Sequence, residues 1–170
     1  MILKGDMLNI LLFCYYINMN ELLLKFIKSN FNKPGSALDL GCGAGDDINN
    51  LKHLGWDTEG VNLPEVDLNF FYKSKKKFDL IYSNYVLQFI KNKDEFLKTC
   101  YNNLKKGGYL FISTFDKSDK VLKNTFEKQD LFDIFNKYFI NIKIEKTKIK
   151  DNHEPIGSHN HIVLVLTARK

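Results

Sequence analysis

The chain has 170 residues, of which 44% are hydrophobic and 14% aromatic, and its formal net charge is +5. This length suits one packed core. Lysines are dispersed among acidic residues, and the short run at 73–77 is more typical of a solvated loop than of a nucleic-acid groove. The three cysteines are widely spaced, which argues against a disulfide framework or paired zinc ligands and predicts a cytoplasmic protein.

The N-terminal segment is strongly apolar from Leu8 to Met19. No small-residue cleavage pattern follows it, and it is shorter than the roughly 20 apolar residues that span a bilayer. We therefore predict a buried helix and no membrane contact. It belongs to a helical cap over residues 1–35, which precedes a core over residues 36–170 in one domain spanning 1–170.

Strand-like apolar runs alternate with helix-period segments along the rest of the chain, which predicts an α/β fold with a mostly parallel sheet. Apolar residues at 22–27 predict a first helix that ends before Pro34 and Gly35. Further helices are expected around 48–54, 96–104 and 130–138, the second of them ending at Gly107 and Gly108. Strands are expected at 37–40, 58–61, 78–83 and 109–115, with an antiparallel terminal pair at 140–149 and 161–167.

A glycine-rich loop at residues 41–45 follows the first strand and precedes a helix. Alternate glycines let the backbone turn sharply and approach a ligand closely. The spacing is GxGxG rather than GxGxxG, and Asp46 and Asp47 stand where a dinucleotide site places its pyrophosphate. Two carboxylates there disfavour a pyrophosphate and favour a ligand with a cationic end. The alternative is that they only complement the helix dipole.

Three segments of the sequence, at 38–45, 78–84 and 104–110, resemble the first motif, the fourth strand and the entry to the fifth strand of the class I S-adenosylmethionine-dependent methyltransferases. The resemblance runs from about Ser36 to the end of the chain. It implies a Rossmann-like three-layer sandwich, S-adenosylmethionine as the cofactor, and methyl transfer to a small-molecule acceptor. The stretch at 151–170 is most similar to small methyltransferases of the tellurite-resistance group.

The same resemblance implies a set of cofactor contacts. The residues that it assigns are Asp39, Gly41, Cys42, Gly43, Gly45, Asn62, Leu63, Asp67 and Ser83. Asn62 departs from the family pattern, which has an acid there for the ribose hydroxyls. An amide lacks the charge and the second acceptor oxygen of a carboxylate, so this departure predicts weaker cofactor binding.

A second departure lies between Asn62 and Asp67, which only four residues separate. The family usually has a helix and a strand there, and a parallel crossover needs a dozen or more residues. We therefore predict a sheet reduced by one edge strand. Asp67 either contacts the adenine amino group or is an ordinary loop carboxylate.

Candidate catalytic groups are few, because methyl transfer from a sulfonium depends mainly on positioning the acceptor and a general base is optional. The histidines that could serve as a base are His153, His159 and His161. His159 and His161 share one face of an extended strand. The three histidines and Glu154 also fit a metal site, but such spacing is unspecific and we expect no metal. Surface or structural histidines fit the pattern equally well.

Other functions fit the sequence less well. Asn62 and the missing strand favour, as the main alternative, a degenerate S-adenosylmethionine-binding regulatory domain without catalysis. A nucleotide-dependent oxidoreductase is more distant. The segment at 83–86 lacks the prolines of base-methylating enzymes, so no nucleic-acid partner is expected.

Two interpretations stay open for several side chains near the loop. Tyr82, Tyr85 and Phe89 line an acceptor pocket or belong to the core, and Cys42 is a small turn residue or a redox-sensitive thiol. The oligomeric state stays open.

Overall fold

The computed structural model describes residues 20–120, 122, 124–153 and 157–170. The helix predicted at Leu8–Met19 lies outside these residues, so the proposed cap and its boundary remain predictions, as does the cytoplasmic location. Within the described residues, no helix is both long enough and apolar enough to cross a bilayer.

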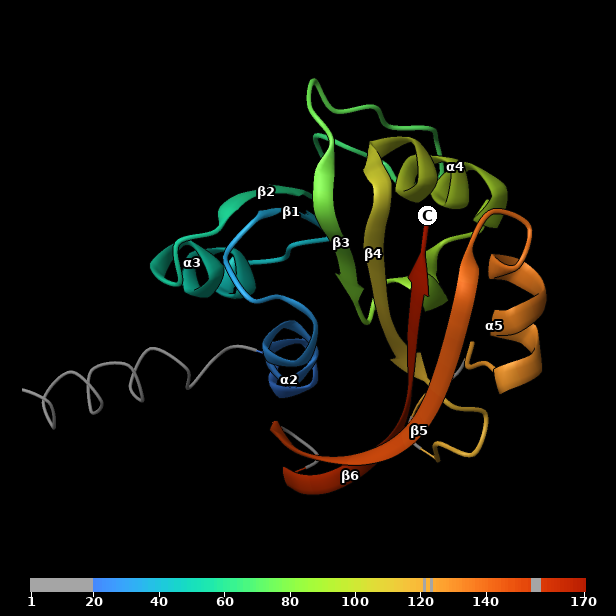
Figure 1. Cartoon of the computed structure of the whole chain (residues 1–170). Helices are drawn as coiled ribbons and strands as arrows, with labels where there is room; N and C mark the ends of the chain where they lie inside the picture. Colours follow the sequence, from blue (N-terminus) through green and yellow to red (C-terminus); the bar gives the residue numbers. More distant parts are fainter. Residues whose placement is uncertain (1–19, 121, 123, 154–156) are drawn as a thin grey trace, which may run out of the picture.

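The elements follow the predicted alternation of helices and strands (Figure 1). Their bounds are α2 (Glu21–Asn30), β1 (Ser36–Leu40), α3 (Asp46–His53), β2 (Asp57–Val61), β3 (Phe78–Asn84), the 3₁₀ turn η2 (Leu87–Phe89), α4 (Lys93–Asn103), β4 (Leu104–Phe115), α5 (Lys128–Phe135), β5 (Ile140–His153) and β6 (Gly157–Arg169).

The six described strands form one sheet in the order β2-β1-β3-β4-β6-β5. β1 to β4 are mutually parallel, whereas β6 is antiparallel to both β4 and β5. This confirms the α/β fold with an antiparallel terminal pair. β2 is the edge strand on the parallel side of the sheet, and the described connection at 62–77 adds neither helix nor strand. The predicted loss of one edge strand is thus also confirmed.

Helices cover both faces of the sheet, because successive side chains of each buried strand point to opposite faces (Figure 1). Ala37, Leu80 and Phe111 pack with α2 and α3 in one apolar cluster. Their strand neighbours, among them Leu38 and Ile81, pack with α4 and α5 in the other. The three layers implied by the family resemblance are therefore present.

The glycine pair at 107–108 does not end a helix, in contrast to the prediction. α4 ends at Asn103, and β4 begins directly at Leu104. Gly107 has a φ of +73°, and the β3–β4 register shifts here, between Phe78 and Leu80 of β3. A glycine with positive φ beside a register shift is typical of a β-bulge, so this pair bends a strand instead.

The β5–β6 hairpin extends well past the carboxyl end of β4. Only the segment of β6 from Val163 to Arg169 pairs with β4, whereas β5 and β6 pair with each other as far as His153 and Gly157. Both strands are longer than predicted. Figure 1 shows this extension curving below the strand ends toward α2. It therefore adds a wall at the edge where parallel strands place ligand sites.

We predict that Ile81→Ala lowers the free energy of unfolding by about 2–5 kcal/mol, because Ile81 is fully buried in β3 and its loss leaves a cavity in the sheet core. Ile140→Ala is the matched control: Ile140 is 63% exposed at the start of β5, and its loss should change the free energy by less than about 1 kcal/mol. Urea denaturation measures both. An equal loss of unfolding free energy in the two variants would contradict the burial of Ile81 in the core.

Candidate functional site

A cavity of about 850 Å³, here called the glycine-loop pocket, lies at the carboxyl ends of β1 and β3. The glycine loop and the first residues of α3 form one side, and Asn84 and Tyr85 continue from β3. The start of α2 and the residues of β5 from Lys148 to Asp151 complete the lining. The pocket thus lies where a doubly wound sheet binds its ligand.

The glycine loop adopts a conformation that depends on its glycines. Gly41, Gly43 and Gly45 have φ values of +90°, +50° and +86°, a region that other residues rarely adopt. A Cβ added to Gly41 would lie 2.4 Å from a methyl carbon of Val86, so this glycine permits close packing. A Cβ on Gly43 or Gly45 would meet no atom within 4 Å. These two positions leave room for a ligand against the backbone.

The loop is fixed to the end of β2. The backbone N–H groups of Gly41 and Cys42 both donate to the carbonyl of Val61, at 2.8 and 3.1 Å. Gly60 makes this approach possible, because a Cβ there would lie 2.2 Å from Cδ1 of Ile48 and 2.8 Å from Cβ of Cys42. Sequence reasoning did not identify Gly60, since a single glycine in a strand carries no signal of what packs on it.

Asp39 is a buried carboxyl group that lines the pocket from near the carboxyl end of β1. Burial raises the pKa of Asp39 well above its usual value, and the charge of Asp47 raises it further, while Tyr82 lowers it. The Tyr82 hydroxyl is buried beside it and makes no hydrogen bond of ordinary geometry within the described residues. A cation bound beside this buried carboxyl group would stabilise its charged form.

Asp47 connects three elements around the pocket. Its Oδ1 accepts from the backbone N–H of Asn20 at 2.8 Å, and its Oδ2 accepts from Nδ2 of Asn84, also at 2.8 Å. Asn84 Oδ1 in turn accepts from the Ser113 hydroxyl at 2.8 Å. Burial raises the pKa of Asp47, and these hydrogen bonds lower it in part. Asp47 therefore links these elements while it lines the pocket, and Asp46 beside it also lines the pocket and is exposed.

The structure brings together only some of the predicted cofactor residues. Asp39, Gly41, Cys42 and Gly43 line the pocket, and Gly45 is the N-cap of α3 directly beside it. Ser83 is fully buried instead, and its hydroxyl donates to the carbonyl of Leu40 at 2.6 Å. It therefore supports the loop from within the sheet and does not line the pocket.

The residues after β2 do not line the glycine-loop pocket. Asn62 directly follows Val61, and its carbonyl accepts from the N–H of Val66. The Leu63 side chain is 65% exposed. Asp67 is exposed and accepts from the backbone and side-chain amides of Asn69, which hold its pKa below the usual value. These positions border the loop without closing over it.

The aromatic candidates have three different environments. Tyr82 is fully buried in the core, Phe89 is 71% exposed, and Tyr85 lines the pocket with its ring stacked on Phe115 at 4.9 Å. Burial and the nearby charge of Asp39 raise the pKa of Cys42, so the thiol is kept protonated. Tyr85 is thus the aromatic side chain at the pocket, and Cys42 is not an activated thiol.

The candidate histidines lie on the β5–β6 hairpin. His153 is the last residue of β5, and its side chain is outside the described part. His161 is buried, and its Nε2 lies 2.9 Å from Nε2 of the partly buried His159. Asp151, which sequence reasoning missed, joins this pair and lines the pocket. Its strand pairing with His159 could be identified only once the hairpin register was known.

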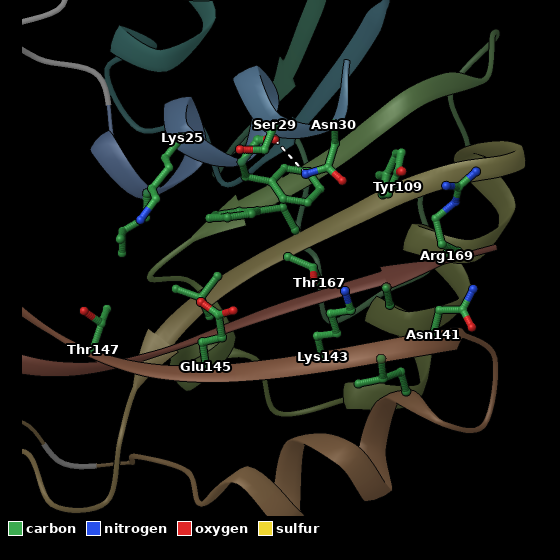
Figure 2. Close-up of a pocket in the computed structure, with 16 residues that line it drawn as sticks. Lys25, Ser29, Asn30, Tyr109, Asn141, Lys143, Glu145, Thr147, Thr167 and Arg169 are labelled. Carbon is green, nitrogen blue, oxygen red and sulfur yellow. Dashed lines mark hydrogen bonds between the residues drawn. The ribbon is translucent and has the colours of Figure 1, made fainter. Parts of the chain in front are cut away.

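A second cavity, of about 660 Å³, lies between α2 and the strands β4, β6 and β5 (Figure 2). Lys25, Ser29 and Asn30 of α2 face Tyr109 and Arg169 across it. The Arg169 guanidinium lies 4.0 Å from the centre of the Tyr109 ring. None of the described site residues predicted from the sequence line this cavity, so the glycine-loop pocket is the candidate site.

Comparison with known proteins finds the same kind of domain. The chain is 28% identical over 138 residues to the mitochondrial ubiquinone biosynthesis O-methyltransferase of Mus musculus, covering 59% of this chain and 37% of that protein. It is 29% identical over 135 residues to the malonyl-[acyl-carrier protein] O-methyltransferase 2 of Ilyobacter polytropus, covering 78% of this chain and 52% of that protein. The chain thus spans about half of these relatives or less.

A solved structure with the same fold is the TehB-like SAM-dependent methyltransferase of Corynebacterium glutamicum. Its TM-score is 0.63 at 19% identity, covering 86% of this chain and 85% of that one. A family model described as a methyltransferase domain matches residues 15–145. That match covers most of the chain and includes the glycine loop, so the chain belongs to the methyltransferase domain family.

Proposed function

We propose that the chain binds S-adenosylmethionine in the glycine-loop pocket and transfers its methyl group to an oxygen of a small-molecule acceptor. The observation that carries this proposal is the pocket lining, which combines acidic side chains with the backbone of the glycine loop. The family match and the resemblance of the loop to the first class I motif support the cofactor. The names of the two relatives, both O-methyltransferases, support an oxygen acceptor.

The residues present fit a ligand with a cationic end. Gly43 and Gly45 leave space beside the backbone where side chains would otherwise stand. Asp39 and Asp46 direct carboxylates into the same space, and an ammonium and a sulfonium would be attracted by them. Asp47 adds to this field while it holds Asn20 and Asn84 in place. The same carboxylates disfavour the pyrophosphate of a dinucleotide.

The chemistry needs little more than alignment. Bound S-adenosylmethionine supplies a methyl group on a good leaving group, so a correctly placed acceptor can react by in-line displacement. The opposite wall of the pocket, from Tyr85 and from Lys148 to Asp151, is where this chain would orient the acceptor. His159 and His161 stand beside Asp151 at that wall, which supports their proposed role near the acceptor.

The alternative of cofactor binding without turnover has one observation in its favour. Asn62 and Leu63, which the family resemblance assigns to the ribose and the adenine, do not line the pocket, and Leu63 is 65% exposed. S-adenosylmethionine binding without turnover across a panel of hydroxyl and carboxylate acceptors would favour this regulatory reading.

Gly43→Ala should weaken S-adenosylmethionine binding by about tenfold or more, because the new methyl group enters the ligand space and the backbone keeps a positive φ. Calorimetric titration with S-adenosylmethionine and S-adenosylhomocysteine measures the affinity.

Gly55→Ala is the control for Gly43→Ala. Gly55 has a φ of +85°, so alanine there is strained in the same way, but it lies in an exposed loop outside the pocket lining. The affinity for S-adenosylmethionine should therefore be unchanged. Wild-type protein that binds neither compound would overturn the proposed function.

Asp39→Asn should raise the free energy of unfolding at pH 7, because it removes a charge that is buried in the folded protein. It should also weaken S-adenosylmethionine binding by about tenfold or more, because the cationic end of the cofactor loses a charged partner. The folded-state pKa of Asp39 is raised, so wild-type stability from this group is greatest below about pH 4 and is lost as the pH rises toward that pKa. The stability difference between variant and wild type should therefore shrink as the pH falls.

Urea denaturation across a pH series measures this stability difference, and calorimetry measures the affinity. Asp46→Asn removes an equal charge from an exposed side chain of the same loop and should not raise the free energy of unfolding. An Asp39→Asn protein that is less stable than wild type at pH 7 would contradict the charge assignment.

A further inference from the structure

Three potential metal ligands converge on the part of the β5–β6 hairpin that extends past β4. Asp151 of β5 is the register partner of His159 of β6, and His161 follows two residues later on the same strand. Cross-strand partners and residues two apart share a face of a hairpin, so the three side chains point the same way. One ligand atom from each lies within 4.8 Å of the others.

The outer contacts of both histidines fix where the ring hydrogens are. His161 Nδ1 lies 3.0 Å from a carboxylate oxygen of the buried Asp119, and His159 Nδ1 lies 2.8 Å from the carbonyl oxygen of Gly157. Both partners are acceptors, so each Nδ1 donates. A neutral imidazole that donates from Nδ1 has a lone pair on Nε2.

The inner atoms are therefore three potential electron-pair donors grouped within 4.8 Å of one another. The two Nε2 atoms lie 2.9 Å apart, and Oδ2 of Asp151 lies 3.8 Å from Nε2 of His161. Lone pairs and a carboxylate at such separations repel one another unless a proton or a metal ion lies between them. We propose that Asp151, His159 and His161 bind a divalent transition metal ion of the zinc type.

The geometry and the surroundings suit such an ion. Two nitrogen ligands in a tetrahedral zinc site lie roughly 3.3 Å apart, given zinc–nitrogen distances of about 2.05 Å. The two imidazoles need to separate by only a few tenths of an ångström to reach this spacing. Asp119 also accepts from the backbone N–H of Ile162 at 2.8 Å, so it is held in place. A fixed carboxylate behind a ligating histidine is the usual outer partner of a metal site.

The proposed site borders the glycine-loop pocket. Asp151 lines that pocket, and Tyr85 stacks on Phe115, whose ring lies 5.0 Å from that of His161. Three protein ligands leave a coordination position for water or for an oxygen of another molecule. If the chain methylates an oxygen, which rests on the proposed function, the ion can bind that oxygen and favour its deprotonated form. This inference reverses our sequence-based expectation of no metal.

The test measures metal binding without any assay of methyl transfer. The full chain is treated with a chelator, dialysed and titrated with Zn²⁺ against a competing indicator, and Co²⁺ absorption reports the coordination geometry. One equivalent should bind. His159→Ala and Asp151→Asn change side chains that are only partly buried, and each should weaken binding by about 100-fold or more, because even the loss of an outer partner costs 10–100-fold.

Two further variants separate a built site from surface binding. His53→Ala removes an exposed histidine from α3 and should leave zinc affinity unchanged. Asp119→Asn should weaken it by about 10–100-fold through the orientation of His161. Unfolding curves confirm that each variant is folded. No stoichiometric zinc binding by the wild-type chain, or equal affinity in the His53 and His159 variants, would overturn the site. Titration with S-adenosylmethionine is independent, so each proposal can fail without the other.

Discussion

The close approach of the glycine loop to the end of β2 is the constraint on which the rest of the site depends. Two backbone N–H groups, from Gly41 and Cys42, share the carbonyl of Val61, and this contact is possible only because Gly60 has no side chain. It fixes the direction in which the chain leaves β1 and the point at which α3 begins. The positions of Asp39 and Asp46 relative to each other, and therefore the charge of the pocket, follow from it.

That charge is present at a cost to the folded protein. Asp39 and Asp47 are largely buried, and burial raises the pKa of both. Asp47 offsets part of this cost through its hydrogen bonds to Asn20 and Asn84, whereas the Tyr82 hydroxyl next to Asp39 makes no hydrogen bond of ordinary geometry within the described residues. A carboxylate without strong partners in a low-dielectric setting attracts a cation strongly. Burial of these two carboxyl groups therefore lowers the stability of the free protein, and under the proposed function the same groups attract the cationic end of the cofactor.

The extended β5–β6 hairpin gives the pocket its second wall. Its strands continue past β4, so Asp151 faces the glycine loop across the cavity while the histidine pair stands directly behind it. The opposite edge of the sheet is reduced, because the short link from β2 to β3 has no room for a further crossover. The pocket thus has Asp151 on its hairpin side, and the histidine pair lies beside Asp151.

The sequence by itself determined the order of helices and strands, the glycine turn at 41–45 and the missing edge strand, because apolar periodicity, positive-φ glycines and link length are local properties. It misplaced the glycine pair at 107–108, because a bulge depends on the neighbouring strand. Tertiary structure alone decided that Ser83 faces inward and that Asp119, Asp151 and the histidines meet, since residues up to 42 positions apart come together only through sheet register and hairpin length.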